Sequence, residues 1–122
     1  MANEFYEETS ILNSIKKRIG PSASYDYFNH DIVSCINSAF TTLHHLGVGE
    51  EPYHITSEAE EWDDFSTNKE FVAWAKDYVY LKTRLLFDPP SNSFLLESIK
   101  DQIKELEWRI NDVVDFPIED VH

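Results

Sequence analysis

The sequence predicts an all-α fold, a small bundle of about four helices with a long loop between the second and the third. Apolar residues recur at helical spacing in four segments of the 122-residue chain. Capping residues or helix breakers bound these segments, and two adjacent prolines, Pro89 and Pro90, separate the last two. Hydrophobic residues make up 42% of the chain and charged residues 27%, which is typical of a globular protein. We therefore expect one domain over residues 1–122.

The first helix is expected to follow a flexible N-terminal segment, residues 1–8. Thr9 or Ser10 can cap it, and Gly20 followed by Pro21 ends it. The helix dipole favours positive charge in the last turn. Three consecutive basic residues, called here the basic cluster, lie in that turn: Lys16, Lys17 and Arg18. A salt link to an acidic neighbouring subunit is the alternative interpretation of this cluster.

The second helix is predicted to have Asn29 as its cap and to end at Gly47. The single cysteine, Cys35, cannot form an internal disulfide and is interpreted as a small residue within this helix. A reactive thiol is the alternative. The apolar face predicted for the helix consists of Ile32, Ile36, Ala39, Phe40, Leu43 and Leu46.

A long link then runs from Gly47 to Ser66, and loops of roughly twenty residues in compact domains tend to be functional or mobile. We expect an inter-subunit contact here. Within the link, Tyr53–Thr56 alternates in polarity, which predicts a short strand or an extended loop. Trp62 and Phe65 are expected to attach its far end to the core, because an aromatic side chain in a polar loop gains most by burial.

The third helix is predicted to start at a capping box, Thr67–Glu70, and to be the central helix because it is apolar around most of its circumference. Two prolines stop it in a corner motif, Phe87, Asp88, Pro89 and Pro90. Ser91 or Ser93 can cap the fourth helix, which should pair with the third in antiparallel orientation. Its apolar seam, with steps of three and four residues, is Leu96, Ile99, Ile103, Leu106, Ile110 and Val113.

Negative charge distinguishes this chain, with a net charge of −13 from 23 acidic and 10 basic residues. This composition excludes an extensive Lys/Arg surface of the kind that grips nucleic-acid phosphates. Seven carboxylates and no basic residue lie between Gly49 and Asp64. A solvated face is the usual explanation of such a run. We call five of these residues the acidic loop: Glu58, Glu60, Glu61, Asp63 and Asp64.

Four blocks of residues follow one another from about Ile11 to Val113. They are a short helix ending Arg18-Ile19-Gly20, the Ile36-Asn37-Ser38-Ala39-Phe40 helix closing in Leu46-Gly47-Val48-Gly49, an acidic link with Trp62, and the Leu85-Leu86-Phe87-Asp88-Pro89-Pro90 corner before Glu105-Leu106-Glu107-Trp108-Arg109. In this order, the blocks resemble the head-tail connector (adaptor) proteins of long-tailed bacteriophages. The resemblance implies a structural virion protein, whose small helical subunits form a ring, expected to be dodecameric, beneath the portal protein.

The resemblance also implies where the chain works and what it contacts. The ring would bind portal on one side and a downstream neck or stopper protein on the other. Duplex DNA would pass through its channel without specific binding, and carboxylates of the acidic loop would repel it. The chain would belong to the head-tail neck of the virion, assembled in the cytoplasm of the host bacterium. No apolar run approaches the roughly 20 residues that span a bilayer, so no membrane contact is expected.

An extended C-terminal tail, residues 114–122, is the last predicted contact. Pro117 prevents the fourth helix from continuing, and the apolar residues around it are costly to leave in water. An extended apolar and acidic tail can add to a partner's groove or sheet edge. Given the resemblance, the expected partner is portal, and the residues assigned to that contact are Phe116, Pro117, Ile118 and Val121.

Neither catalysis nor a cofactor is expected. Adjacent His44 and His45 point about 100° apart on a helix, so they cannot chelate one metal ion together. The sequence has no glycine-rich phosphate loop and no recognisable nucleophile elbow. Two rivals to the connector hypothesis remain. One is an acidic helical inhibitor or DNA-mimic module, and the other is a small hydrolase that uses the acidic loop.

Overall fold

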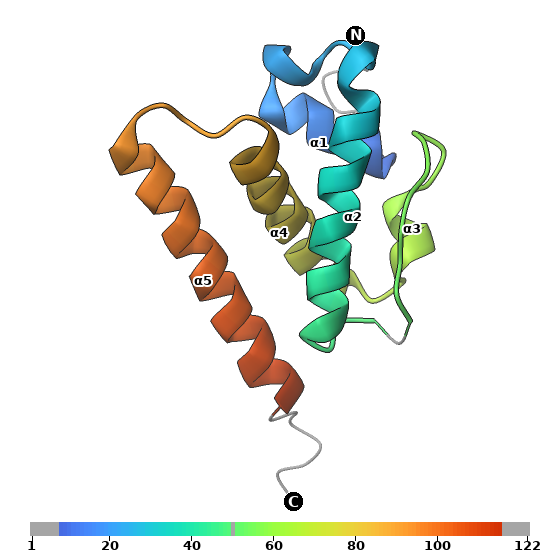
Figure 1. Cartoon of the computed structure of the whole chain (residues 1–122). Helices are drawn as coiled ribbons and strands as arrows, with labels where there is room; N and C mark the ends of the chain where they lie inside the picture. The colour runs from blue at the N-terminus through green and yellow to red at the C-terminus, as the bar shows by residue number, and fades with distance from the viewer. Residues whose placement is uncertain (1–7, 50, 116–122) are drawn as a thin grey trace, which may run out of the picture.

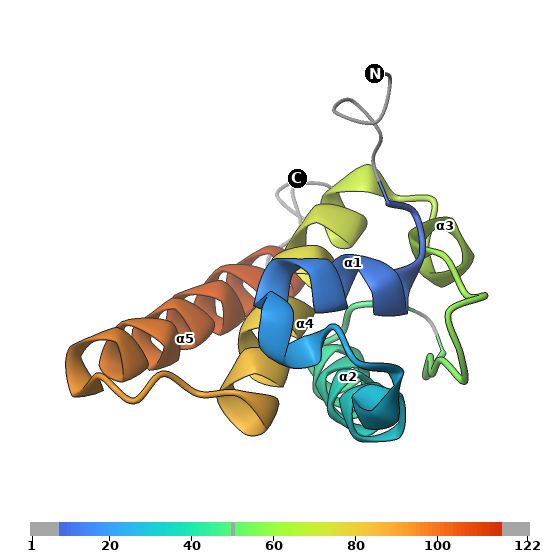
Figure 2. The same ribbon diagram turned by 90° about the horizontal axis from the view of Figure 1, so that it is seen from above.

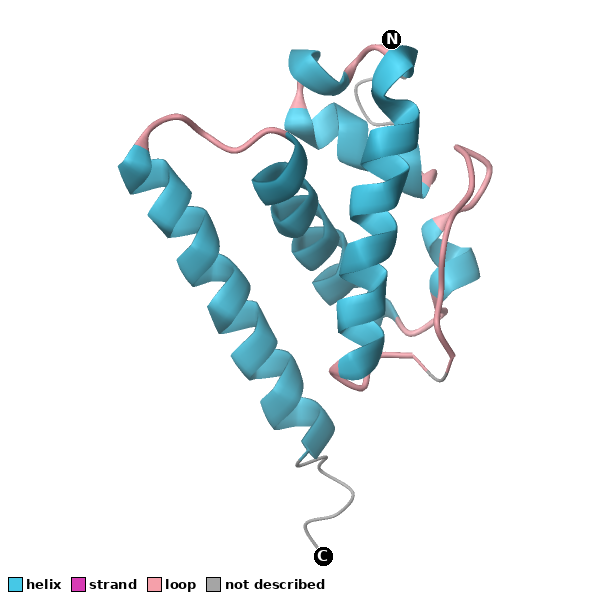
Figure 3. Cartoon of the chain, in the orientation of Figure 1, coloured by secondary structure: helices cyan, strands magenta, loops and turns pink. Residues whose placement is uncertain are grey.

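The computed structural model describes residues 8–49 and 51–115. These residues form five α-helices and no β-strand, which confirms the all-α prediction (Figure 3). The central helix lies between its neighbours in two views (Figures 1 and 2). The elements in chain order are α1 (Ile11–Ile19), the 3-10 turns η2 (Pro21–Ala23) and η3 (Asp26–Phe28), α2 (Asn29–His45), α3 (Trp62–Phe65), α4 (Lys69–Phe87) and α5 (Ser93–Asp115).

Helix α1 begins and ends where the sequence predicts. The hydroxyl of Ser10 accepts a hydrogen bond from the backbone N–H of Asn13 at 3.2 Å, so Ser10 rather than Thr9 is the cap. Gly20 ends the helix with φ of 107°, a conformation that glycine adopts without steric cost. The side chains that α1 buries are Ile11, Leu12 and Ile15.

Helix α2 begins one residue earlier than predicted. Asn29 has helical backbone angles, φ −56° and ψ −41°, so its assignment as the cap is wrong and Phe28 holds that position. The turn η3 leads directly into the helix, and the Asn29 side chain accepts a hydrogen bond from Nζ of Lys16 at 2.6 Å instead. The predicted apolar face is confirmed, with Leu46 half-buried and with Ile32, Ile36, Ala39, Phe40 and Leu43 buried.

The link after α2 is an extended loop at Tyr53–Thr56 rather than a strand. One side chain, Asn37 of α2, holds it. Its Oδ1 accepts from the N–H of Ile55 at 2.7 Å, and its Nδ2 donates to the Ile55 carbonyl at 2.9 Å. The amide therefore satisfies both backbone groups that a neighbouring strand would pair. This Asn37 clamp lets the Ile55 side chain reach the core, where it is 1% exposed.

Helix α3 is a short element that the sequence analysis missed. The side chains of Glu61 and Asp64 each accept a hydrogen bond from the other residue's backbone, which makes a capping box. Two backbone hydrogen bonds join this region to the start of α1. Ile11 N–H donates to the Glu60 carbonyl at 3.0 Å, and Trp62 N–H donates to the Thr9 carbonyl at 3.1 Å. The link is thus fixed to α1 as well as to α2.

Two aromatic residues attach the far end of the link to the core, as predicted. Trp62 is 3% exposed, and its Nε1 donates to the hydroxyl of Ser14 at 2.9 Å. The ring of Phe65 lies 5.0 Å from that of Phe40 in α2, between their centroids, and Tyr53 lies 5.2 Å from the same Phe40 ring. These rings cover one side of α2.

Helix α4 is the central element, and it contacts α1, α2, α3 and α5. Its cap is Asn68, because Oδ1 of that residue accepts from the N–H groups of Glu70 and Phe71 at 2.9 and 3.1 Å. The capping box predicted to begin at Thr67 is therefore wrong by one residue. Asparagine accepts as well as threonine at this position, and here Asn68 has the extended backbone angles that a cap requires.

Helices α4 and α5 form an antiparallel pair (Figure 1). Ser93 opens α5 as predicted, but the cap is Asn92, whose Oδ1 accepts from the N–H groups of Phe94 and Leu95 at 2.8 and 3.2 Å. Neither Ser91 nor Ser93 is therefore the cap. The predicted seam is confirmed for its middle: Ile99, Ile103 and Ile110 are buried, and Leu96 and Leu106 are half-buried.

The end of α5 departs from the predicted seam. Val113 is 42% exposed, and the next residue, Val114, contacts Gly47 at the end of α2 instead. A Cβ on Gly47 would lie 2.6 Å from Cγ1 of Val114, so only glycine fits there. Val114 and Asp115 belong to the helix, so the tail cannot start at residue 114. Of the two predicted terminal segments, residues 1–7 and 116–122 lie outside the described residues.

One buried hydrogen bond crosses between α4 and α5. The hydroxyl of Tyr78, which is fully buried, donates to Oε2 of Glu107 at 2.6 Å. Burial and then the bond to Glu107 raise the pKa of Tyr78 above its ordinary value, because both disfavour the phenolate. The pair links the two helices near the middle of their contact.

We expect Asn37→Ala to destabilise the fold by about 1–3 kcal/mol, because it leaves the N–H and carbonyl of Ile55 without partners. Urea unfolding followed by circular dichroism measures the change. Ser38→Ala is the matched control on α2, since Ser38 is exposed, and it should alter the free energy of unfolding by less than about 0.5 kcal/mol. Equal effects of the two substitutions would contradict the Asn37 clamp.

Tyr78→Phe should flatten the loss of stability at alkaline pH. A pKa raised in the folded state contributes stability below the unfolded value of about 10, and that stability is lost as pH rises above it. Each such tyrosine adds a slope of up to about 1.4 kcal/mol per pH unit. Burial also raises the pKa of Tyr53 to about 12, so part of the slope should remain. Urea titrations from neutral pH upward test this, and identical slopes in wild type and Tyr78→Phe would refute it.

Candidate interaction surfaces

The corner motif is tied to the segment between α1 and α2. Asp88 N–H donates to the Arg84 carbonyl at 2.9 Å and closes α4. The Asp88 carboxylate accepts from the hydroxyl of Ser22 at 2.6 Å, and the ring of Phe87 meets that of Phe28 edge to face with 5.5 Å between centroids. The motif therefore fixes where α4 ends relative to η2 and η3.

The acidic loop divides into carboxylates with local partners and carboxylates without them. Oε2 of Glu60 accepts from both the N–H and the hydroxyl of Thr56, at 3.0 and 2.8 Å, and its Oε1 accepts from the N–H of Ser57 at 3.0 Å. Partial burial tends to raise the pKa of Glu60, but these hydrogen bonds to the carboxylate outweigh it, and the pKa is lowered. Glu60 thus closes the turn that leads into α3.

Glu61 and Asp64 are likewise engaged in the capping box of α3. Glu58 and Asp63 differ, because both are exposed and neither forms a hydrogen bond or ion pair within the described part of the chain. Only these two members of the acidic loop present carboxylates with no structural role there. The sequence pattern alone could not separate the two groups.

The basic cluster is used largely inside the protomer. Lys16 pairs with Asp26 at 3.2 Å. Arg18 pairs with Asp77 at 3.1 Å and lies 4.0 Å from the ring centroid of Tyr80, which favours a cation–π contact. Lys17, between them, is exposed. The helix-dipole interpretation therefore needs intramolecular salt links added to it, and Lys17 is the member that points to solvent.

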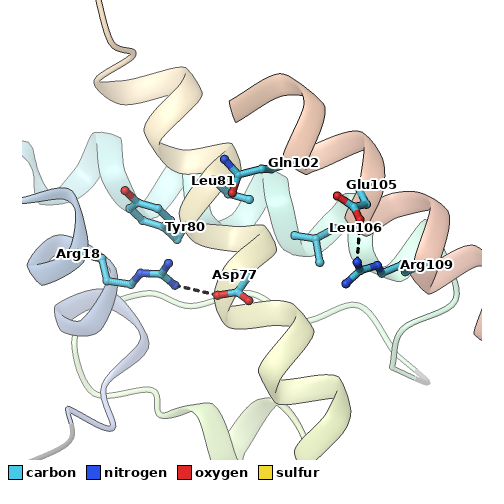
Figure 4. A pocket seen from close by; sticks show the side chains of 8 residues that line it. All are labelled: Arg18, Asp77, Tyr80, Leu81, Gln102, Glu105, Leu106 and Arg109. Carbon is cyan, nitrogen blue, oxygen red and sulfur yellow. Dashed lines mark hydrogen bonds and ion pairs between the residues drawn. The ribbon is translucent and has the colours of Figure 1, made fainter. Parts of the chain in front are cut away.

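A hollow of about 270 Å³ opens between α4 and α5 beside the end of α1 (Figure 4). Its charges are already paired, Arg18 with Asp77 and Arg109 with Glu105 at 2.7 Å. The sequence analysis missed it because its residues lie up to ninety positions apart along the chain. The lining residues are Arg18, Asp77, Tyr80, Leu81, Gln102, Glu105, Leu106 and Arg109.

Large apolar side chains are exposed along α5, a surface that the sequence analysis also missed. Phe94 is 79% exposed and Trp108 is 68% exposed. Fourteen residues separate them, close to four turns of 3.6 residues, so both lie on one face of the helix. This spacing off the seam was the available signal. Exposed aromatic residues of this size are typical of protein-protein contacts.

Chemistry finds little support in the part of the chain that the structure describes. It contains no group of three or more His, Cys, Asp or Glu side chains placed to hold a metal ion. Burial, and then the charge of Asp31, raise the pKa of Cys35, which favours the less reactive thiol form. Among the described helices, none is both long and apolar enough to cross a membrane.

One comparison with known proteins gives a match. A family model described as phage connector protein matches residues 11–115, a range that includes all the helices of the described chain. The search of curated proteins and the search of solved structures gave no match. The family is structural rather than enzymatic, and its proteins are components of the phage virion. With most of the sequence matched, and the resemblance of the four blocks confirmed, this chain belongs to the phage connector protein family.

Proposed function

We propose that the protein is a head-tail adaptor, which forms a ring between the portal protein and downstream neck or tail proteins. The observation that carries this proposal is the family match over residues 11–115. A small helical protomer with exposed apolar residues on one helix is consistent with it, because such residues are stabilised when a neighbouring subunit covers them. Its function would be geometric, to join two rings of the neck around a channel.

The ring is proposed to be dodecameric and to sit in the head-tail neck of the virion, after assembly in the cytoplasm of the host bacterium. Duplex DNA would pass through its channel without specific binding. The net charge of −13 supports this part, since carboxylates repel phosphates over about 10 Å at moderate ionic strength. Glu58 and Asp63, which are exposed, are the carboxylates of the acidic loop best suited to that task.

The C-terminal tail is proposed to bind portal through its apolar residues. Phe116, Ile118 and Val121 alternate with polar or proline positions, which suits an extended segment that adds to a partner's groove or sheet edge. Residue 115 ends α5, so the tail would leave the bundle from the end of its longest helix. A downstream neck or stopper protein would bind the opposite side of the ring.

We expect light scattering across a concentration series to detect a ring-sized species, alone or after purified portal is added. Deletion of residues 116–122 should abolish portal binding while the helical circular dichroism is retained, because the deleted residues follow the last helix. Glu119→Gln with Asp120→Asn is the matched control for the tail, since it keeps the apolar residues.

Two outcomes would count against the proposal. A strict monomer that ignores portal would favour the acidic-inhibitor alternative, which predicts competition with DNA for a basic protein. Unchanged portal binding by the deleted protein would remove the tail from the interface and leave the ring intact as a proposal.

Neutralisation of the acidic loop should separate repulsion from folding. Glu58→Gln with Asp63→Asn should leave thermal stability unchanged and increase retention of DNA by assembled rings, measured by co-sedimentation at low salt. Glu60→Gln with Asp64→Asn removes the same formal charge, but it should lower the melting temperature, because both carboxylates accept backbone hydrogen bonds. If the two pairs behave alike, the division of the acidic loop is wrong.

A further inference from the structure

One face of α5 has no partner among the described helices. Residues spaced by three and four along α5 lie within about 40° of one another around the helix axis. All of them are exposed, and they comprise two aromatic residues, three carboxylates and one lysine. We call this the α5 outer face: Phe94, Glu97, Asp101, Lys104, Trp108 and Asp112. It combines apolar anchors with negative charge.

A hollow of about 570 Å³ has the opposite character. It lies between α3 and the first turns of α4, where Val72 and Ala73 provide apolar lining and Lys69 and Lys76 provide positive charge. A smaller hollow of about 270 Å³ adjoins it, because Lys76 lines both, and Lys17 lies in the smaller one. We call Lys17, Lys69 and Lys76 the lysine strip.

The charge of this region is unusual for the chain. Four cationic side chains line the two hollows, the lysine strip together with Arg18, against the two carboxylates of Glu8 and Asp63. The whole chain has a net charge of −13. An anionic surface with an apolar anchor is therefore the chemistry that fits the lysine strip, and the α5 outer face has both properties.

The two surfaces lie on different sides of the protomer. Helices α3 and α5 occupy opposite sides of the bundle in both views (Figures 1 and 2), with α4 between them. A contact between two different surfaces cannot close into a two-fold dimer. It repeats head to tail and generates a ring or a filament.

We propose that the α5 outer face of one copy docks on the lysine strip of the next copy. Trp108 is the apolar anchor against Val72 and Ala73, and Asp101 and Asp112 face Lys69. This inference rests on the proposed function, since it supplies the subunit contact of the ring. Tryptophan is among the residues whose truncation costs most at protein interfaces, and its ring also accepts a cation–π contact from lysine.

Two other occupants fit the surfaces less well. A pairing of α5 outer faces with each other would bring Asp101 and Asp112 of both copies together, and like charges across an interface are unfavourable. The phosphates of DNA would suit the lysine strip, but an apolar lining of Val72 and Ala73 suits an indole ring better than a phosphate. A second copy satisfies both surfaces at once.

Trp108→Ala tests the anchor by sedimentation velocity over a concentration series, with the protein alone and with purified portal. We expect self-association to weaken about tenfold or more. The fold should persist, because Trp108 is exposed, and circular dichroism checks this. Tyr27→Ala is the matched control, since Tyr27 is 88% exposed but lies in η3, outside both surfaces. It should leave assembly unchanged.

A charge exchange tests the partner surface. Lys69→Glu should weaken assembly, and Asp101→Lys with Asp112→Lys should restore it in the Lys69→Glu background. Loss by Trp108→Ala without any effect of Lys69→Glu would overturn the assignment of the lysine strip. Normal assembly by Trp108→Ala would overturn the docking proposal alone. A wild-type protein that never assembles would overturn the proposed function as well.

Discussion

The structure depends on the burial of one helix, α4, by all the others. Ala75, Tyr78 and Val79 are fully buried, and the helix contacts α1, α2, α3 and α5. A chain of 122 residues has enough apolar surface for one such core. Each neighbouring helix therefore turns its single apolar stripe towards α4. The consequence is greatest for α5, which has α4 on one side and exposes Phe94 and Trp108 on the other.

Sequence reasoning predicted the helices well because their periodicity and breakers are local properties. Gly20 and the proline pair mark helix ends through their own backbone restrictions, and these ends lie where they were predicted. The caps were less predictable. At the starts of α4 and α5 an asparagine, Asn68 or Asn92, adjoins a serine or threonine of similar preference, and the path of the chain decides between them.

The candidate surfaces were predictable only in part, for a different reason. A run of carboxylates looks uniform in sequence, yet Glu60 and Asp64 are consumed by local turns while Glu58 and Asp63 are not. Arg18 has its partner, Asp77, 59 residues away, so no local pattern could reveal that pair. Val113 and Val114 are equally apolar, and only the position of Gly47 determines which one is buried. Tertiary context fixes each of these roles.

The Asn37 clamp has a consequence for motion. The extended part of the link is held to α2 by the amide of one side chain and by the Ile55 side chain, whereas α4 is enclosed on several sides. Local opening of the link exposes few buried groups, so its free energy lies below that of global unfolding. The link can therefore detach and reattach while the helices stay folded, and its amide protons should exchange with solvent before those of α4. A segment with this property can be remodelled by a binding partner without the cost of disrupting the bundle.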